Sequence, residues 1–116
     1  MKDPLIFYHY PRCKHSRKGL QYLRDHDIPC TVVEYMVSPL DEAQLRMILL
    51  KLNRKPVEIV RTRDTLFQRE LKGKQFTEDE WIKILLEHPA LMLRPIVVAK
   101  HKAVVAIPPE KIDGLL

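Results

Sequence analysis

Two short apolar segments flank a helical stretch at the start of the chain, and this order leaves few possible folds. Residues 5–8 and 30–35 have the β-branched and aromatic character of strands, while the spacing of Leu20, Leu23 and Arg24 is helical. A helix that joins two neighbouring strands in this way makes them parallel, with a right-handed crossover. The chain is therefore expected to begin as a β-α-β unit.

The middle of the sequence is helical, and its last part is a strand hairpin followed by a helix. Helices are predicted over residues 41–52 and 56–69 and from a capping box at Thr77–Glu80 onward. Strands are predicted at residues 96–99 and 103–107. The link between them is so short that it forces an antiparallel hairpin. A short final helix is predicted from Pro108 to Leu116.

This order of elements is that of the thioredoxin fold. A β-α-β half comes first, the helical segment follows as an insert, and a β-β-α half ends the sequence. We therefore expect an α/β (α+β) protein with a thioredoxin-like fold and a helical insert, organised as a single domain over residues 1–116. A chain of 116 residues buries roughly two thirds of the surface that its unfolded form exposes.

Composition argues against several other classes of protein. The net charge is +5, but the 20 Lys and Arg residues are spread along the chain and do not alternate with aromatic residues, so no nucleic-acid partner is expected. The apolar stretches are shorter than the ~20 residues of a membrane span. Two cysteines and the lack of a signal segment predict a cytoplasmic protein, which we expect to be a monomer. The histidine spacing predicts no metal site.

One cysteine lies in the turn between the first strand and its helix. Cys13 is expected to face the free N–H groups and the positive dipole end of that helix, and Arg12, Lys14 and Arg17 add positive charge around it. These groups stabilise a thiolate, so the pKa of Cys13 is expected to fall. The same field attracts a small oxyanion. The turn therefore predicts a nucleophilic thiol beside an anion site.

Three motifs follow one another along nearly the whole chain. They are His9-x-Pro11-x-Cys13-x-x-Ser16-Arg17, Ile59-Val60-Arg61-Thr62-Arg63 and Leu91-Met92-Leu93-Arg94-Pro95-Ile96-Val97-Val98. Together they resemble the arsenate reductase and Spx family, whose members are glutaredoxin-like proteins with a helical insert. The resemblance implies an oxidoreductase in which the Cys13 thiolate attacks arsenate, with glutathione as co-substrate and glutaredoxin completing the reduction to arsenite. It implies no bound cofactor.

The resemblance also assigns roles within the site. Cys13 is the implied nucleophile, His9 helps to lower its pKa, and the Ser16 hydroxyl donates to its sulfur. Guanidinium groups suit the substrate because they bind tetrahedral oxyanions in two-pronged fashion and stay charged. The expected substrate-binding residues are Arg17, Arg61 (or its neighbour Arg63), Arg94 and Pro95, the last as a cis-proline opposite the cysteine.

Two positions differ from the family pattern. Ile107 stands where arsenate reductases of this type have a third arginine, and Tyr10 replaces the asparagine common after His9. One cation fewer weakens oxyanion binding by about 1.5–3 kcal/mol. Two alternatives follow, a glutathione-dependent thiol reductase without arsenate activity and an Spx-like regulator that binds RNA polymerase. Ser16 argues against the regulator, because it leaves no Cys-x-x-Cys pair in the turn.

The second cysteine has two possible roles. Cys30 is either a resolving thiol for Cys13 or a packing residue, and its place at the start of a predicted central strand favours packing. The turn itself offers Cys-x-x-Ser, without a partner thiol. This favours a mixed disulfide between Cys13 and an external thiol such as glutathione.

Overall fold

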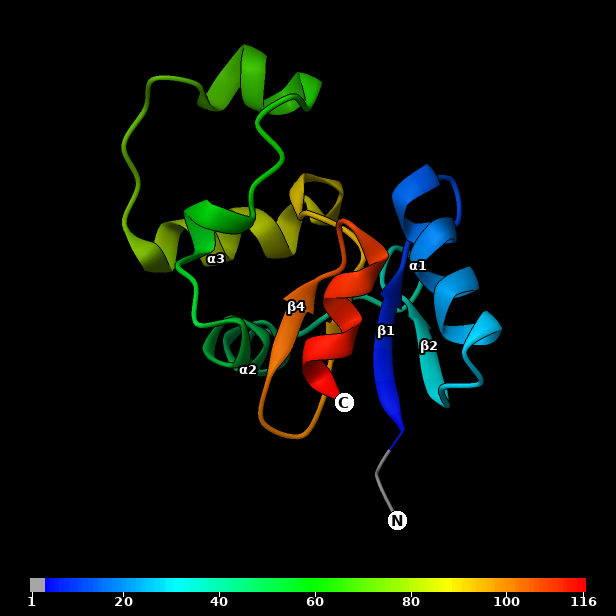
Figure 1. Cartoon of the computed structure of the whole chain (residues 1–116). Coiled ribbons are helices and arrows are strands. Elements are labelled where there is room, and N and C mark those ends of the chain that lie inside the picture. Colours follow the sequence, from blue (N-terminus) through cyan, green and yellow to red (C-terminus); the bar gives the residue numbers. More distant parts are fainter. Residues whose placement is uncertain (1–3) are drawn as a thin grey trace. The chain divides into compact units, whose positions relative to one another are not determined.

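The computed structural model, which describes residues 4–116, contains a four-stranded sheet built from the two ends of the chain (Figure 1). Its strands are β1 (Leu5–His9), β2 (Cys30–Glu34), β3 (Ile96–Val98) and β4 (Ala103–Val105), in the spatial order β2-β1-β3-β4. Strand β1 pairs in parallel with β2 and antiparallel with β3, and β3 pairs antiparallel with β4. The predicted β-α-β start and C-terminal hairpin are confirmed.

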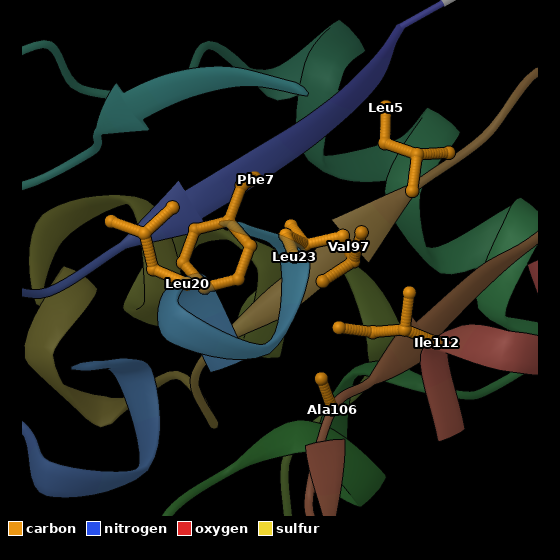
Figure 2. Packing of buried hydrophobic residues seen from close by; sticks show 7 residues of the cluster. All are labelled: Leu5, Phe7, Leu20, Leu23, Val97, Ala106 and Ile112. Carbon is orange, nitrogen blue, oxygen red and sulfur yellow. The ribbon is translucent and has the colours of Figure 1, made fainter. Parts of the chain in front are cut away.

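Helix α1 (Lys14–Asp25) packs on the sheet through the apolar face that its spacing predicts. Leu20 and Leu23 lie against Phe7 of β1 and Val97 of β3, and Ile112 completes the same buried cluster (Figure 2). Ile112 belongs to a 3-10 helix over Pro109–Leu115, which is the short final helix expected from the sequence. This core holds β1 in place, and the turn that contains Cys13 follows the end of that strand.

The chain forms two compact units. One contains the residues up to Ser38 together with Arg94–Leu116, and the other is the inserted segment Pro39–Leu93. The division agrees with the helical insert predicted between the β-α-β and β-β-α halves. The expectation of a single domain over residues 1–116 stays a prediction, and its first three residues lie outside the described part.

The inserted unit is built around two helices with matching starts, α2 (Glu42–Leu52) and α3 (Glu78–Glu87). Each begins with a reciprocal capping box, Asp41 with Gln44 and Thr77 with Glu80. No helix among the described residues has the length and apolar character needed to cross a membrane. The buried residues of the two helices are Leu45, Ile48, Leu49, Leu52, Trp81, Ile82 and Leu85.

The continuous helix predicted over 56–69 is wrong. The stretch begins with a 3-10 helix at Pro56–Ile59 and runs into one turn of π-helix at Phe67–Leu71. Between them the chain pairs with a distant segment, and the Ile59 carbonyl accepts the Leu93 N–H at 2.8 Å. That bond uses a carbonyl that a continuous α-helix would bond within itself.

Candidate active site

The turn after β1 is held by hydrogen bonds around Ser16. The Tyr10 N–H donates to Ser16 Oγ at 2.9 Å, and the same oxygen lies 2.8 Å from Nδ1 of His9. The Cys13 N–H donates to the Tyr10 carbonyl at 3.0 Å. Ser16 is fully buried and His9 is 8% exposed, so water competes little with these bonds. The turn is thereby fixed, with Cys13 as the N-cap of α1.

Cys13 is a free, partly buried cysteine whose surroundings favour the thiolate. Burial raises the pKa of its thiol, but hydrogen bonding from the Ser16 backbone N–H, the Arg94 side chain and the His15 backbone N–H lowers it, and so does the charge of Arg94. The net pKa lies below the ordinary value. The lowered pKa expected from the sequence is therefore confirmed, and helix-start N–H groups contribute to it.

The cation that acts on the sulfur comes from far along the chain. Arg94 lies two residues before the start of β3, and the antiparallel pairing of β1 with β3 brings it to the turn. The nearby cations lie elsewhere, because Arg17 Nη1 donates to the Pro11 carbonyl at 3.0 Å while Arg12 and Lys14 are exposed. The sequence predicts that Arg94 binds the substrate, but no local signal in it indicates the contact of Arg94 with the sulfur. The role of Arg17 in substrate binding stays a prediction.

The side chain of Arg94 rests on an aromatic ring, and its backbone is anchored next to α1. Its guanidinium carbon is 4.2 Å from the ring centroid of Tyr10, a cation–π contact. The Arg94–Pro95 peptide bond is cis, as the family resemblance implies, and Pro95 is fully buried. A Cβ at Gly19 of α1 would lie 3.0 Å from Pro95 Cγ. The helix approaches this closely because position 19 has no side chain.

Burial favours the neutral form of the His9 imidazole. Burial is the main reason that the pKa of its imidazole falls below the ordinary 6.5, with Glu34 opposing and Arg24 contributing to the fall. A neutral imidazole adds no positive charge to the thiolate. His9 instead bonds the Ser16 hydroxyl, and the Ser16 backbone N–H is the group that acts on Cys13. The structure therefore links His9 to the sulfur through Ser16.

Arg61 lies in the inserted unit and is held by several bonds there. Its N–H donates to the Leu91 carbonyl at 2.6 Å, and its Nη1 donates to the Ala90 carbonyl at 3.0 Å. Nη1 also lies 3.3 Å from the Asp64 carboxylate, which offsets part of its charge. The alternative, Arg63, is exposed. Binding of an oxyanion by Arg61 stays a prediction.

The position of the missing arginine is occupied by a partly exposed apolar side chain. Strand β4 ends at Val105, two residues earlier than the predicted limit of 107. The N–H of Ile107 donates to the Val105 carbonyl at 2.9 Å. The Ile107–Pro108 peptide bond is cis. The side chain at position 107 carries no charge to offer an anion.

Cys30 lies at the other end of β1 from Cys13. It pairs with Leu5, the first residue of β1, whereas Cys13 follows the last residue, His9. The strand rise puts these two ends roughly 13 Å apart, beyond the ~7 Å Cα separation that a disulfide tolerates. Strand β2 is an edge strand and not the predicted central one. Cys30 still packs against the core and burial raises its pKa, so the packing role is confirmed.

The turn thus combines the parts needed for attack by a thiolate. Cys13 is partly exposed, and backbone N–H groups together with the Arg94 guanidinium stabilise the negative charge of its thiolate. Within residues 4–116 no three His, Cys, Asp or Glu side chains gather as metal ligands. The absence of a metal from the reaction stays a prediction.

Comparison with known proteins gives consistent likenesses over almost the whole chain. The model of the ArsC family matches residues 8–115. An arsenate reductase of Neisseria meningitidis is 35% identical over 111 residues, which cover 94% of this chain and 95% of the relative. The solved structure of an arsenate reductase from Vibrio cholerae has a TM-score of 0.92 at 27% identity, covering 100% of both chains. The regulatory protein MgsR of Bacillus subtilis is 31% identical, covering 94% of this chain and 87% of its own length.

Proposed function

Because this chain belongs to the ArsC family, we propose that it is a thiol oxidoreductase of the arsenate reductase type with Cys13 as its nucleophile. The observation that carries the proposal is the lowered pKa of Cys13, for which the Ser16 N–H and Arg94 are the main causes working against burial. The thiolate is the form of cysteine that attacks electrophiles. Cys30, whose pKa is raised by burial, is unsuited to the task.

In the proposed reaction the Cys13 sulfur attacks arsenic(V), and an oxygen leaves as hydroxide or water. The two electrons that take arsenic to the +3 state come from two thiols, those of glutathione and glutaredoxin, which leave joined as a disulfide. Arg94, with Arg61 and Arg17 as further candidates, neutralises the oxyanion. Water then attacks arsenic(III), an As–O bond replaces the As–S bond, and the Cys13 sulfur departs as a thiolate that the helix-start N–H groups stabilise again. A reducing cytoplasm, which keeps both thiols available, is the proposed location.

A coupled assay tests this proposal. Oxidation of NADPH is followed with arsenate, glutathione, glutaredoxin and glutathione reductase, for the wild type and for variants of each cysteine. We expect activity that disappears in Cys13→Ser and persists in Cys30→Ser, the matched control. Arsenate reduction by Cys13→Ser, or its absence in a wild type whose Cys13 is reactive, would contradict the proposal.

A second candidate is a glutathione-dependent thiol reductase without arsenate activity, and Ile107 favours it. The site has one cation fewer than the family pattern, and a charge-assisted hydrogen bond contributes about 1.5–3 kcal/mol, or roughly ten- to a hundredfold in oxyanion affinity. Reduction of a glutathione mixed disulfide should then depend on Cys13 while arsenate gives no signal. If Ile107→Arg gains arsenate reduction that the wild type lacks, this second function is the better description.

A third candidate is a regulator that binds RNA polymerase, favoured by the likeness to the regulatory protein MgsR. A local disulfide switch is not available to it, because Ser16 occupies the second position of the motif and its Oγ bonds His9 and the Tyr10 N–H. Cys30 is at the opposite end of β1. Retention of RNA polymerase by the immobilised wild-type chain, with none by an unrelated basic protein, would support the regulator. A lack of retention would remove this candidate.

A further inference from the structure

Tyr10 stands where the family pattern has asparagine, and its ring lies against the Arg94 guanidinium at 4.2 Å. We propose that Tyr10 is a positioning residue that holds the Arg94 guanidinium against the sulfur of Cys13. The inference deepens the proposed function and rests on it, because it concerns how the reactive thiolate is made. No substrate is needed to test it.

The ring of Tyr10 is fixed by the same turn that places the sulfur. Its N–H donates to Ser16 Oγ at 2.9 Å, and its carbonyl accepts the Cys13 N–H at 3.0 Å. These two backbone bonds fix the position of the Tyr10 Cα–Cβ bond relative to Cys13. They do not involve the ring, so they remain when the side chain at position 10 is changed.

The Arg94 side chain needs such support. Its backbone is anchored by the buried Pro95, but the long side chain has many rotamers, and each hydrogen bond that it makes costs conformational freedom. The Tyr10 ring offers a flat surface that matches the planar guanidinium. Stacking uses the face of that group, so it does not compete with a hydrogen bond from its edge to the Cys13 sulfur.

An asparagine at position 10 offers no such surface. In a chain with asparagine there, Arg94 is free to turn away from the sulfur and toward an arriving oxyanion. Tyr10 therefore biases Arg94 toward making the thiolate. The bias matters more in this chain because Ile107 stands where the family pattern has a third arginine. Fewer cations therefore remain that could replace Arg94.

The test measures how fast iodoacetamide alkylates Cys13, at a pH below the midpoint of its pH profile. Mass spectrometry of the modified peptides reports Cys13 and Cys30 in the same sample, and Cys30 packs in the core, so its rate reports an intact fold. We expect Tyr10→Asn and Tyr10→Leu to slow alkylation of Cys13 about two- to fivefold, the factor given by ~0.5–1 kcal/mol of cation–π energy. Tyr10→Phe keeps an aromatic face and should stay close to the wild type.

A double-mutant cycle with Arg94→Met shows whether the ring acts through Arg94. We expect Arg94→Met alone to slow alkylation of Cys13, and Tyr10→Leu to have no further effect in that background. An unchanged rate in Tyr10→Leu, or an equal slowing with and without Arg94, would overturn the proposal. Because no arsenate is present, failure here is distinguishable from failure of the proposed function.

Discussion

Replacement of Ser16 by alanine tests the hydrogen bonds that fix the functional turn. The substitution removes Oγ, which accepts the Tyr10 N–H and bonds Nδ1 of His9. Ser16 is fully buried, so the vacated position offers little room for a replacement water. We expect Ser16→Ala to reduce both the free energy of unfolding and the stability of the turn around Cys13.

The magnitude follows from the two partners that lose their bonds. A buried polar group left without a partner costs about 1–3 kcal/mol. The cost for His9 is near the middle of that range because its side chain is buried, and the cost for Tyr10 is at the lower end because that residue is partly exposed. Alanine is the better helix former by about 0.5 kcal/mol, which offsets part of the loss. The net destabilisation is about 2.5 kcal/mol.

Urea unfolding followed by circular dichroism measures this difference. With a slope of about 2 kcal/mol per molar urea, the midpoint should fall by about 1.2 M. The matched control is Ser38→Ala, an exposed serine in the same unit, which should change the free energy by less than about 0.5 kcal/mol. If the free energy of unfolding of Ser16→Ala lies within about 0.5 kcal/mol of the wild-type value, the reasoning about the turn is refuted.

Three further results are expected. Because burial is the main cause that holds the pKa of folded His9 below its ordinary 6.5, the unfolded chain binds that proton first, and the free energy of unfolding should fall as the pH drops below about 6.5. Urea titrations at several pH values should show a weaker fall in His9→Gln, and equal falls would contradict the assignment. Gly19→Ala should lower stability by about 1 kcal/mol in thermal melts, since crowding against Pro95 outweighs the gain in helix propensity; a more stable variant would show that the neighbours yield. The Tyr22 hydroxyl donates to Asp113 at 2.6 Å, which raises the pKa of Tyr22 to about 12. Alkaline absorbance titration should detect one tyrosine with this raised pKa, and the pKa should fall in Asp113→Asn. An unchanged pKa in that variant would show that the carboxylate is not the cause.

The features that sequence predicted correctly depend on neighbouring residues. The capping box of Thr77 and Glu80 needs only residues three apart, and it is present. The short link before Ala103 permits only a hairpin, and β3 and β4 form one. Cys13 at a strand-to-helix turn is likewise a local pattern, and its lowered pKa follows in part from the helix-start N–H of Ser16. Such features were within reach of sequence reasoning.

The errors concern contacts between distant segments. Local spacing predicted a helix over 56–69, but backbone bonding of Ile59 to Leu93 breaks it. The nearest cations in sequence seemed best placed to stabilise the thiolate, yet Arg94 does so through the pairing of β1 with β3. The sequence predicts a central strand around Cys30, because nothing in it indicates that β2 pairs on one side only. No local pattern contains this information.

The central claim is that the turn after β1 favours the thiolate form of Cys13 but not of Cys30. The pH profiles of alkylation test this claim most directly. Cys13 is measured in Cys30→Ser and Cys30 in Cys13→Ser, with iodoacetamide over a range of pH. Because Arg94 and the helix-start N–H groups outweigh burial at Cys13, while burial prevails at Cys30, the midpoint for Cys13 should lie below that of an ordinary thiol and the midpoint for Cys30 above it. Coincident midpoints, or a higher midpoint for Cys13, would contradict the account.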